Sequence, residues 1–291
     1  MVRILLALVL LLAGPAAAHA ADDGRYLRYE VYWGGLHAAD FALSLDREGD
    51  AYRHEFRMRS SGITDWLFKL DITARSQGRV HASGPPLPES YRTDFVNRWR
   101  NGLVDIRYQP GHGDGPATMT VTEWADPPRR ADDDDDRADV VGEEARAGAL
   151  DPLAAFTEAV RLAGQRLAAG NGEFRLKVFD GRRRFDLVGT PLGMGNLNVL
   201  GQPRQVQRMR LRTEPVAGFN GRQQTLWNER VFEVFFVPSA TPDGEPVPVR
   251  IAADGMGPVI NLTAACTERA ACSVGPRAAE DNRAANGANP S

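Results

Sequence analysis

The sequence is poor in cysteine, has no surplus of basic residues and has no long hydrophobic run beyond its first twenty residues. A metal site would need more ligands than two cysteines, and none of the five histidines lies near that pair. Acidic residues outnumber basic ones by 38 to 35, which gives no net positive field for a phosphate backbone. We therefore expect no nucleic-acid partner, no metal and no cofactor.

The one long hydrophobic run lies at the start of the chain. Ten apolar residues, 4–13, follow Arg3, and the small-residue stretch after them ends in Ala18-His19-Ala20. A run of this length is too short to span a bilayer, and the order of features is typical of a secretory signal peptide. We predict a signal peptide over residues 1–20 with cleavage after Ala20, export to the periplasm and no transmembrane segment after cleavage. A short membrane anchor is the alternative.

The two cysteines, Cys266 and Cys272, are separated by five residues. In an oxidising compartment such a pair can close a small structural loop, and we predict this disulfide. Two free thiols, or redox or metal chemistry, are the alternatives.

Most of the chain alternates apolar and polar residues in short segments, which is typical of half-buried β-strands. In residues 25–33 the alternate positions hold Leu27, Tyr29, Val31 and Trp33. Glycine-containing pairs at 34–35 and 180–181 predict hairpin turns. Further strands are predicted at 36–45, 51–60, 91–96, 103–108, 119–124, 173–179, 182–188, 207–213, 226–237 and 247–251.

One segment has helical periodicity. Over residues 150–169 apolar residues recur at helical spacing, Asp151 stands at the N-cap position and Pro152 at the first helical position. These features predict one amphipathic helix. The sequence therefore indicates a mainly β fold, with a large curved antiparallel sheet or half-open barrel around this helix.

Three segments interrupt the pattern. Residues 126–148 contain five consecutive aspartates and are predicted to be an exposed acidic loop. Residues 189–203 are glycine-rich and are predicted to be a loop, and residues 273–291 are predicted to be disordered. We expect residues 21–265 to form a single β-rich domain.

The order of several short segments resembles the domain-of-unknown-function 3108 family of exported bacterial proteins. These segments are YEVYWGG (29–35), SQGRV (76–80), PESY (88–91), LDPLAA (150–155), VFDGRR (178–183) and PVRI (248–251). The resemblance covers most of residues 25–262. It implies an exported, mostly β protein without an established activity, and by analogy a curved sheet similar to that of periplasmic lipoprotein carriers.

Motifs of common enzymes are absent from the sequence. It has no G-x-S-x-G, H-E-x-x-H or P-loop motif, and no catalytic residue is assigned. Trp66, Leu67 and Phe68 could form the apolar wall or lip of a binding site, although sheet core is the simpler interpretation. Arg182 and Arg184 could contact an anion or a lipid headgroup, although a solvated hairpin is the simpler interpretation.

These observations lead to three hypotheses for function. In the first, a non-catalytic envelope protein binds an apolar or amphiphilic ligand, such as a lipid or lipoprotein, in the concavity of its sheet. In the second, a structural or interaction protein of the envelope binds a protein partner. The third is an envelope hydrolase with dispersed catalytic residues.

Overall fold

The computed structural model describes residues 25–80, 84–111, 117–127, 140–170, 172–228, 230–238, 246–255 and 257–274. Its strands are β1 (Arg25–Trp33), β2 (Leu36–Glu48), β3 (Ala51–Ser60), β4 (Asp71–Val80), β5 (Pro86–Val96), β6 (Asn101–Gln109), β7 (Thr118–Asp126), β8 (Phe174–Phe179), β9 (Arg184–Val199), β10 (Gln202–Ala217), β11 (Val231–Val237), β12 (Val247–Ala253) and β13 (Val259–Cys266). Its helices are α1 (Gly62–Phe68), α2 (Glu143–Arg146), α3 (Pro152–Ala168), α4 (Gly221–Asn228) and α5 (Arg269–Cys272).

The thirteen strands form one antiparallel sheet with the order β7-β6-β5-β4-β3-β2-β1-β13-β12-β11-β10-β9-β8. Its middle strand, β1, pairs with its sequence neighbour β2 on one side and with β13 on the other. The β1–β2 connection is a two-residue turn in which Gly34 and Gly35 have φ of 57° and 82°, values that glycine adopts without a Cβ penalty. The predicted turn at this position is confirmed.

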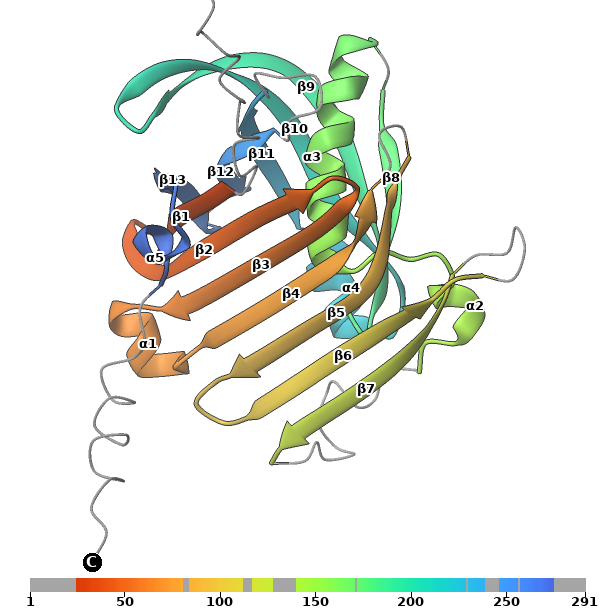
Figure 1. The fold of residues 1–291 in the computed structure, drawn as a ribbon. Coiled ribbons are helices and arrows are strands. Elements are labelled where there is room, and N and C mark those ends of the chain that lie inside the picture. Colours follow the sequence, from red (N-terminus) through yellow and green to blue (C-terminus); the bar gives the residue numbers. More distant parts are fainter. Residues whose placement is uncertain are drawn as a thin grey trace, which may run out of the picture.

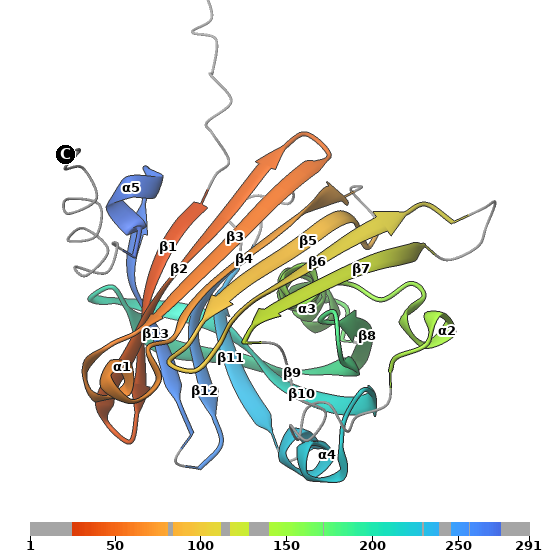
Figure 2. The ribbon, with the colours of Figure 1, turned by 90° about the horizontal axis from the view of Figure 1, so that it is seen from below.

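The sheet curls around α3 (Figures 1 and 2). The helix contacts β3, β4 and β5 on one wall and β8 and β9 on the other, while α2 contacts both edge strands, β7 and β8. Among the described strands β7 and β8 do not pair with each other, so the sheet is strongly curved but not closed. The predicted fold class, a large curved antiparallel sheet around one long helix, is confirmed.

The start of α3 is fixed by a buried aspartate. The Asp151 carboxylate accepts hydrogen bonds from the backbone N–H of Leu153 (3.0 Å) and Ala154 (2.9 Å), and Pro152 occupies the first turn. The same carboxylate accepts a hydrogen bond from the Ser76 hydroxyl of β4 at 2.8 Å. Asp151 therefore caps the helix, as predicted, and also fastens it to the sheet.

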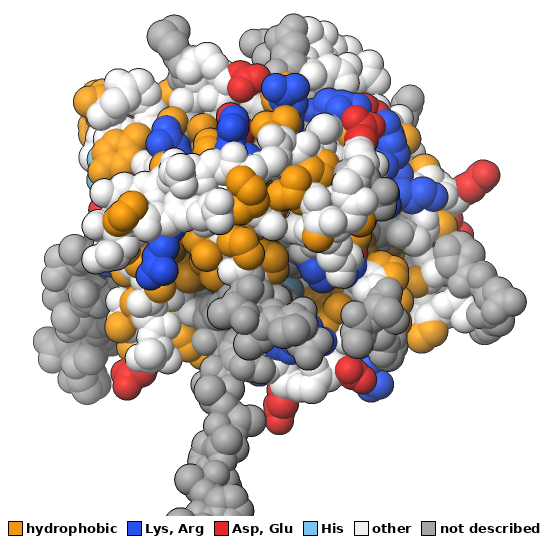
Figure 3. Space-filling view, turned by 90° about the horizontal axis from the view of Figure 1, so that it is seen from above, with side chains coloured by type: hydrophobic (Ala, Val, Ile, Leu, Met, Phe, Trp, Pro, Cys, Tyr) orange, Lys and Arg blue, Asp and Glu red, His pale blue; other side chains and the backbone are white. Residues whose placement is uncertain are grey.

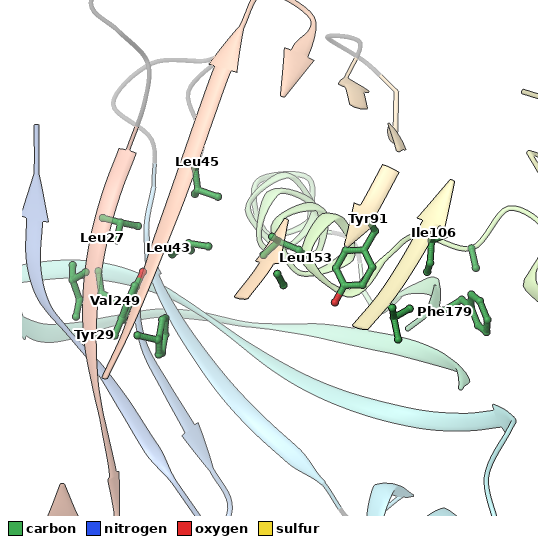
Figure 4. Packing of buried hydrophobic residues seen from close by; sticks show 14 of the residues in the cluster. Leu27, Tyr29, Leu43, Leu45, Tyr91, Ile106, Leu153, Phe179 and Val249 are labelled. Atoms are coloured by element: carbon green, nitrogen blue, oxygen red, sulfur yellow. The ribbon is translucent and has the colours of Figure 1, made fainter. Parts of the chain in front are cut away.

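The core lies between the inner faces of the two walls and α3. Figure 4 shows Leu27, Tyr29, Leu43 and Leu45 on one side of the helix, and Tyr91 and Ile106 on another. A second cluster packs the alanine-rich face of α3 against β8 to β11. Side chains from strands far apart in sequence thus meet around a single helix.

Four details of the sequence prediction are wrong. Residues 189–203 form the ends of two sixteen-residue strands, β9 and β10, joined by a tight turn. The start of the strand predicted at 226–237 belongs to α4. The turn at Asp180-Gly181 has four residues, because Phe179 pairs with Arg184. Four short helices accompany α3 in the described residues.

Several predicted segments lie partly or wholly outside the described residues. These are the signal peptide (1–20), the aspartate run of the acidic loop (132–136) and most of the C-terminal segment, from residue 275 onward. Within 126–148, Asp126 ends β7 and residues 143–146 form α2.

The predicted disulfide between Cys266 and Cys272 is present, with the two Cα atoms 5.8 Å apart. It holds α5 beside the sheet. The guanidinium of Arg269 on α5 forms ion pairs with Asp46 of β2 (2.8 Å) and Glu55 of β3 (3.1 Å). The residues after β13 are therefore held on the outer surface of neighbouring strands.

We predict that Asp151→Ala lowers the free energy of unfolding by about 2–4 kcal/mol, because it removes the helix cap and leaves the Ser76 hydroxyl without its acceptor. Asp151→Asn keeps a capping oxygen and should cost much less. Urea denaturation of both variants measures the difference. Equal losses in the two variants would show that the cap contributes little.

Candidate functional site

The concavity predicted to hold a lipid-like ligand is filled by core side chains and α3 (Figure 4). A pocket of about 40 Å³ lies between α3 and the inner faces of β2 and β3. Its walls include Leu45, His54, Val160 and the Glu158–Arg161 ion pair. This volume holds about three water molecules, whereas sites for drug-sized ligands measure roughly 300–1,000 Å³. The pocket is too small for a lipid chain.

A buried polar group lies beside this pocket. The Tyr52 hydroxyl is 3.3 Å from the Ser76 hydroxyl, which donates to Asp151. His54 is 4% exposed, and neither of its ring nitrogens has a hydrogen-bond partner in the described part of the chain. Burial raises the pKa of Asp151 to about 6 and lowers the pKa of His54 to about 4.

These residues are not connected as a hydrolytic triad. Ser76 donates directly to Asp151, with no bond to His54 between them, and Ser76 is only 1% exposed. A nucleophile needs a base within hydrogen-bond reach and access to substrate. In this arrangement the polar group anchors the helix and does not activate a nucleophile.

Trp66, Leu67 and Phe68 lie on α1, a short helix between β3 and β4, so they are neither sheet core nor the wall of an internal cavity. Ser60 donates to the Asp65 carboxylate at 2.8 Å, and the Ser61 N–H donates to the Ala38 carbonyl of β2 at 2.8 Å. These bonds fix α1 at the end of the sheet, and no residue of the helix is buried.

The turn between β5 and β6 lies against α1. Its Arg98 N–H donates to the Phe68 carbonyl at 2.7 Å, and the Trp99 ring packs edge-on to Phe68 with 6.1 Å between ring centres. The guanidinium carbon of Arg98 lies 5.7 Å from the centre of the Trp66 ring, a distance that suits a cation–π contact. The Asn97 side chain accepts from the N–H of Trp99 and Arg100, which fixes the turn.

Further exposed apolar residues lie at the same strand ends. Trp33 and Leu36 flank the β1–β2 turn, which lies beside α1 in Figure 2, and Trp124 pairs with Leu103 near the end of β7. We call the whole set the aromatic rim: Trp33, Leu36, Ile63, Trp66, Leu67, Phe68, Val96, Trp99 and Trp124.

Four of the five tryptophans of the chain belong to the aromatic rim. Trp33, Trp66, Trp99 and Trp124 are 56%, 67%, 62% and 55% exposed. The fifth, Trp227, packs against Phe185 and Phe219. A group of exposed large apolar residues of this kind marks an interaction site in most soluble proteins.

A hollow of about 380 Å³ adjoins the aromatic rim. Trp33, Phe232 and Pro258 form part of its lining, and Arg230 and Asp254 contribute charged groups. Figure 3, which shows the molecule from above, presents hydrophobic side chains mixed with basic, acidic and uncharged ones. Among the described residues, the exposed large hydrophobic residues of the β9–β10 hairpin are Met194, Leu200 and Val216.

Arg182 and Arg184 do not join the aromatic rim. Arg184 is 4% exposed, donates to the Ala145 carbonyl at 3.1 Å and pairs with Asp186 at 2.7 Å. Arg182 lies 3.4 Å from Glu123 of the edge strand β7. Arg184 thus joins β9 to α2, which lies on the far side of the molecule from α1 in Figure 2, whereas Arg182 pairs with the residue next to Trp124.

Within the described ranges, no group of three or more His, Cys, Asp and Glu side chains is placed to hold a metal ion. None of the described helices is both long and apolar enough to cross a membrane.

The family model described as "Protein of unknown function (DUF3108)" matches residues 28–255. The chain belongs to this family. The resemblance inferred from the order of the short segments is thereby confirmed. No curated protein matches the chain. Among solved structures, the chain is similar to a beta-barrel-like protein of domain of unknown function DUF1849 from Brucella abortus. The two share 12% identity over 83% of this chain and 96% of that one, with a TM-score of 0.48.

The sequence indicates one segment of the aromatic rim, residues 66–68, as a candidate binding feature and does not indicate the rest. The sequence pattern places Trp33 on the apolar face of a strand and Trp124 at the end of the strand predicted at 119–124, and it indicates no role for Trp99 or Trp124. A tryptophan near each of several predicted turns was the available signal. It could not be interpreted without the strand order that brings those turns together.

We predict opposite pH effects for the two buried ionisable groups beside the pocket. Folded Asp151, with its raised pKa, binds a proton between about pH 6 and 4 that the unfolded chain does not, so acid stabilises the fold through Asp151. Folded His54, with its lowered pKa, stays neutral between about pH 6.5 and 4 while the unfolded chain binds a proton, so acid destabilises the fold through His54.

Relative to the unmodified chain, Asp151→Asn should therefore lose about 2 kcal/mol more stability between pH 7 and pH 4, and His54→Gln about 3 kcal/mol less. Chemical denaturation across this pH range measures both differences. Parallel stability curves for the three proteins would contradict the assignment.

Proposed function

We propose that this protein is an exported, non-catalytic component of the cell envelope that binds an amphiphilic partner through the aromatic rim. The observation that carries the proposal is the exposure of four tryptophans at one end of the sheet. Indole rings have a large apolar surface and one N–H donor, so they suit surfaces that are partly apolar and partly wet.

Because core side chains and α3 fill the concavity, we place the binding site at the end of the sheet and not inside it. The hypothesis of an amphiphilic ligand is kept, but the pocket under α3 is too small for it. The aromatic rim and the hollow of about 380 Å³ beside Trp33 offer the apolar surface that the interior does not.

Three features support the exported and non-catalytic parts of the proposal. The pattern of residues 1–20 is that of a signal peptide, and a disulfide such as Cys266–Cys272 is typical of oxidising compartments. The separation of His54 from the Ser76–Asp151 bond favours a binding protein over a hydrolase.

We predict that Trp66→Ala with Trp99→Ala weakens binding to neutral detergent micelles about tenfold or more, because each indole would lose its apolar contact. Intrinsic fluorescence should shift to the blue on binding in the unmodified chain, and the titration gives the affinity. Met194→Ala with Leu200→Ala removes two exposed apolar residues elsewhere and serves as the control. Unchanged affinity in the tryptophan variant, or an equal loss in the control, would refute a role for the aromatic rim.

A further inference from the structure

We infer that the partner of the aromatic rim is the surface of an anionic lipid bilayer; this inference rests on the proposed function. The rim residues lie on separate turns at one set of strand ends, and α1, the β5–β6 turn and the end of β7 follow one margin of the molecule (Figure 1). A flat surface can contact such a margin at several points at once.

Basic side chains lie among the aromatic ones. Lys69 directly follows α1 and is exposed, and exposed Arg98 lies beside the Trp66 ring. Arg100 follows Trp99 on the same turn. Lys and Arg beside Trp form the pattern that places a protein at the boundary between headgroups and acyl chains of anionic membranes.

Most acidic side chains of this region are half-buried and bound to a neighbouring residue. Half-buried Asp65 accepts from Ser60, and half-buried Asp71 pairs with Arg59 at 2.8 Å. Asp126 is exposed but lies at the end of β7, beyond Trp124. The exposed charge around α1 and the β5–β6 turn is therefore positive, which complements anionic headgroups.

The outer face of the neighbouring strands has a different charge pattern. There Arg92 pairs with Asp94 at 2.9 Å, and Arg107 pairs with Asp105 at 2.7 Å. Among the described residues, Lys69 and Arg98 form no such ion pair. The basic side chains that form no ion pair thus lie beside the tryptophans. This arrangement favours an anionic membrane over an uncharged one.

The hollow beside Trp33 adds a place for an apolar chain at the same end of the molecule. Phe232 and Pro258 line it, and both Arg230 and Asp254 lie in its wall. The apolar part of its lining suits a lipid chain, and the Arg230 guanidinium suits a headgroup phosphate. This geometry again favours lipid as the partner.

The test is flotation of the full chain with vesicles of phosphatidylcholine alone or with one quarter phosphatidylglycerol. We expect binding to the anionic vesicles to be on the order of tenfold tighter or more, and to weaken as salt is raised. Lys69→Gln with Arg98→Gln should remove most of this preference, at about fivefold per basic side chain.

Arg92→Gln with Arg107→Gln removes the same number of charges from the outer face and is the matched control, and thermal unfolding confirms that each variant folds. Equal binding to both kinds of vesicle, or an equal loss in the control, overturns the anionic bilayer while the tryptophan-dependent micelle binding still stands. Rim-dependent crosslinking to one envelope protein, with no vesicle binding, also overturns it. Loss of tryptophan dependence in the micelle titration instead refutes the proposed function itself.

Discussion

The bond from Ser76 to Asp151 holds the long helix inside the sheet, and the rest of the architecture depends on that position. A fully buried carboxylate is costly, and here two backbone N–H groups and one hydroxyl offset the cost. Because α3 occupies the concavity, side chains from both walls pack on it. In the described residues the interior is therefore packed for stability, and the large exposed apolar side chains gather at strand ends.

The sequence predicted correctly those elements that a local pattern of residues specifies. Alternation identified β1 and β8, and Asp151-Pro152 identified the start of α3. The error at residues 189–203 has a different origin. Glycine was interpreted as a sign of a loop, but a Cβ at Gly189 would lie 2.2 Å from the Phe174 ring, and one at Gly195 would lie 2.9 Å from Arg208. Those glycines permit close packing of β9 against β8 on one side and against β10 on the other.

The aromatic rim was harder to predict because it depends on pairings between strands that are far apart in sequence. The composition of Trp66-Leu67-Phe68 was visible, but its exposure follows from how α1 is tied to Ala38 of β2. Trp33, Trp99 and Trp124 share one end only because the strand order brings their turns together. Arg184 shows the converse case. Its neighbours in sequence suggest a solvated turn, whereas the chain near Ala145 covers it.

The pairing of β1 with β13 has a consequence for how the molecule is made. The middle strand of the sheet has one neighbour within a few residues and the other more than two hundred residues later, with Tyr26 opposite Cys266. Until the distal segment is available, half of the hydrogen-bonding capacity of β1 has no strand to meet. The strands β1 to β7 on one side and β8 to β13 on the other can form early from local hairpins. Pairing of β1 with β13 joins the two halves of the sheet late, because it has a large loop-closure cost. While the chain folds, the unpaired edge of β1 is therefore the place most exposed to wrong strand pairing.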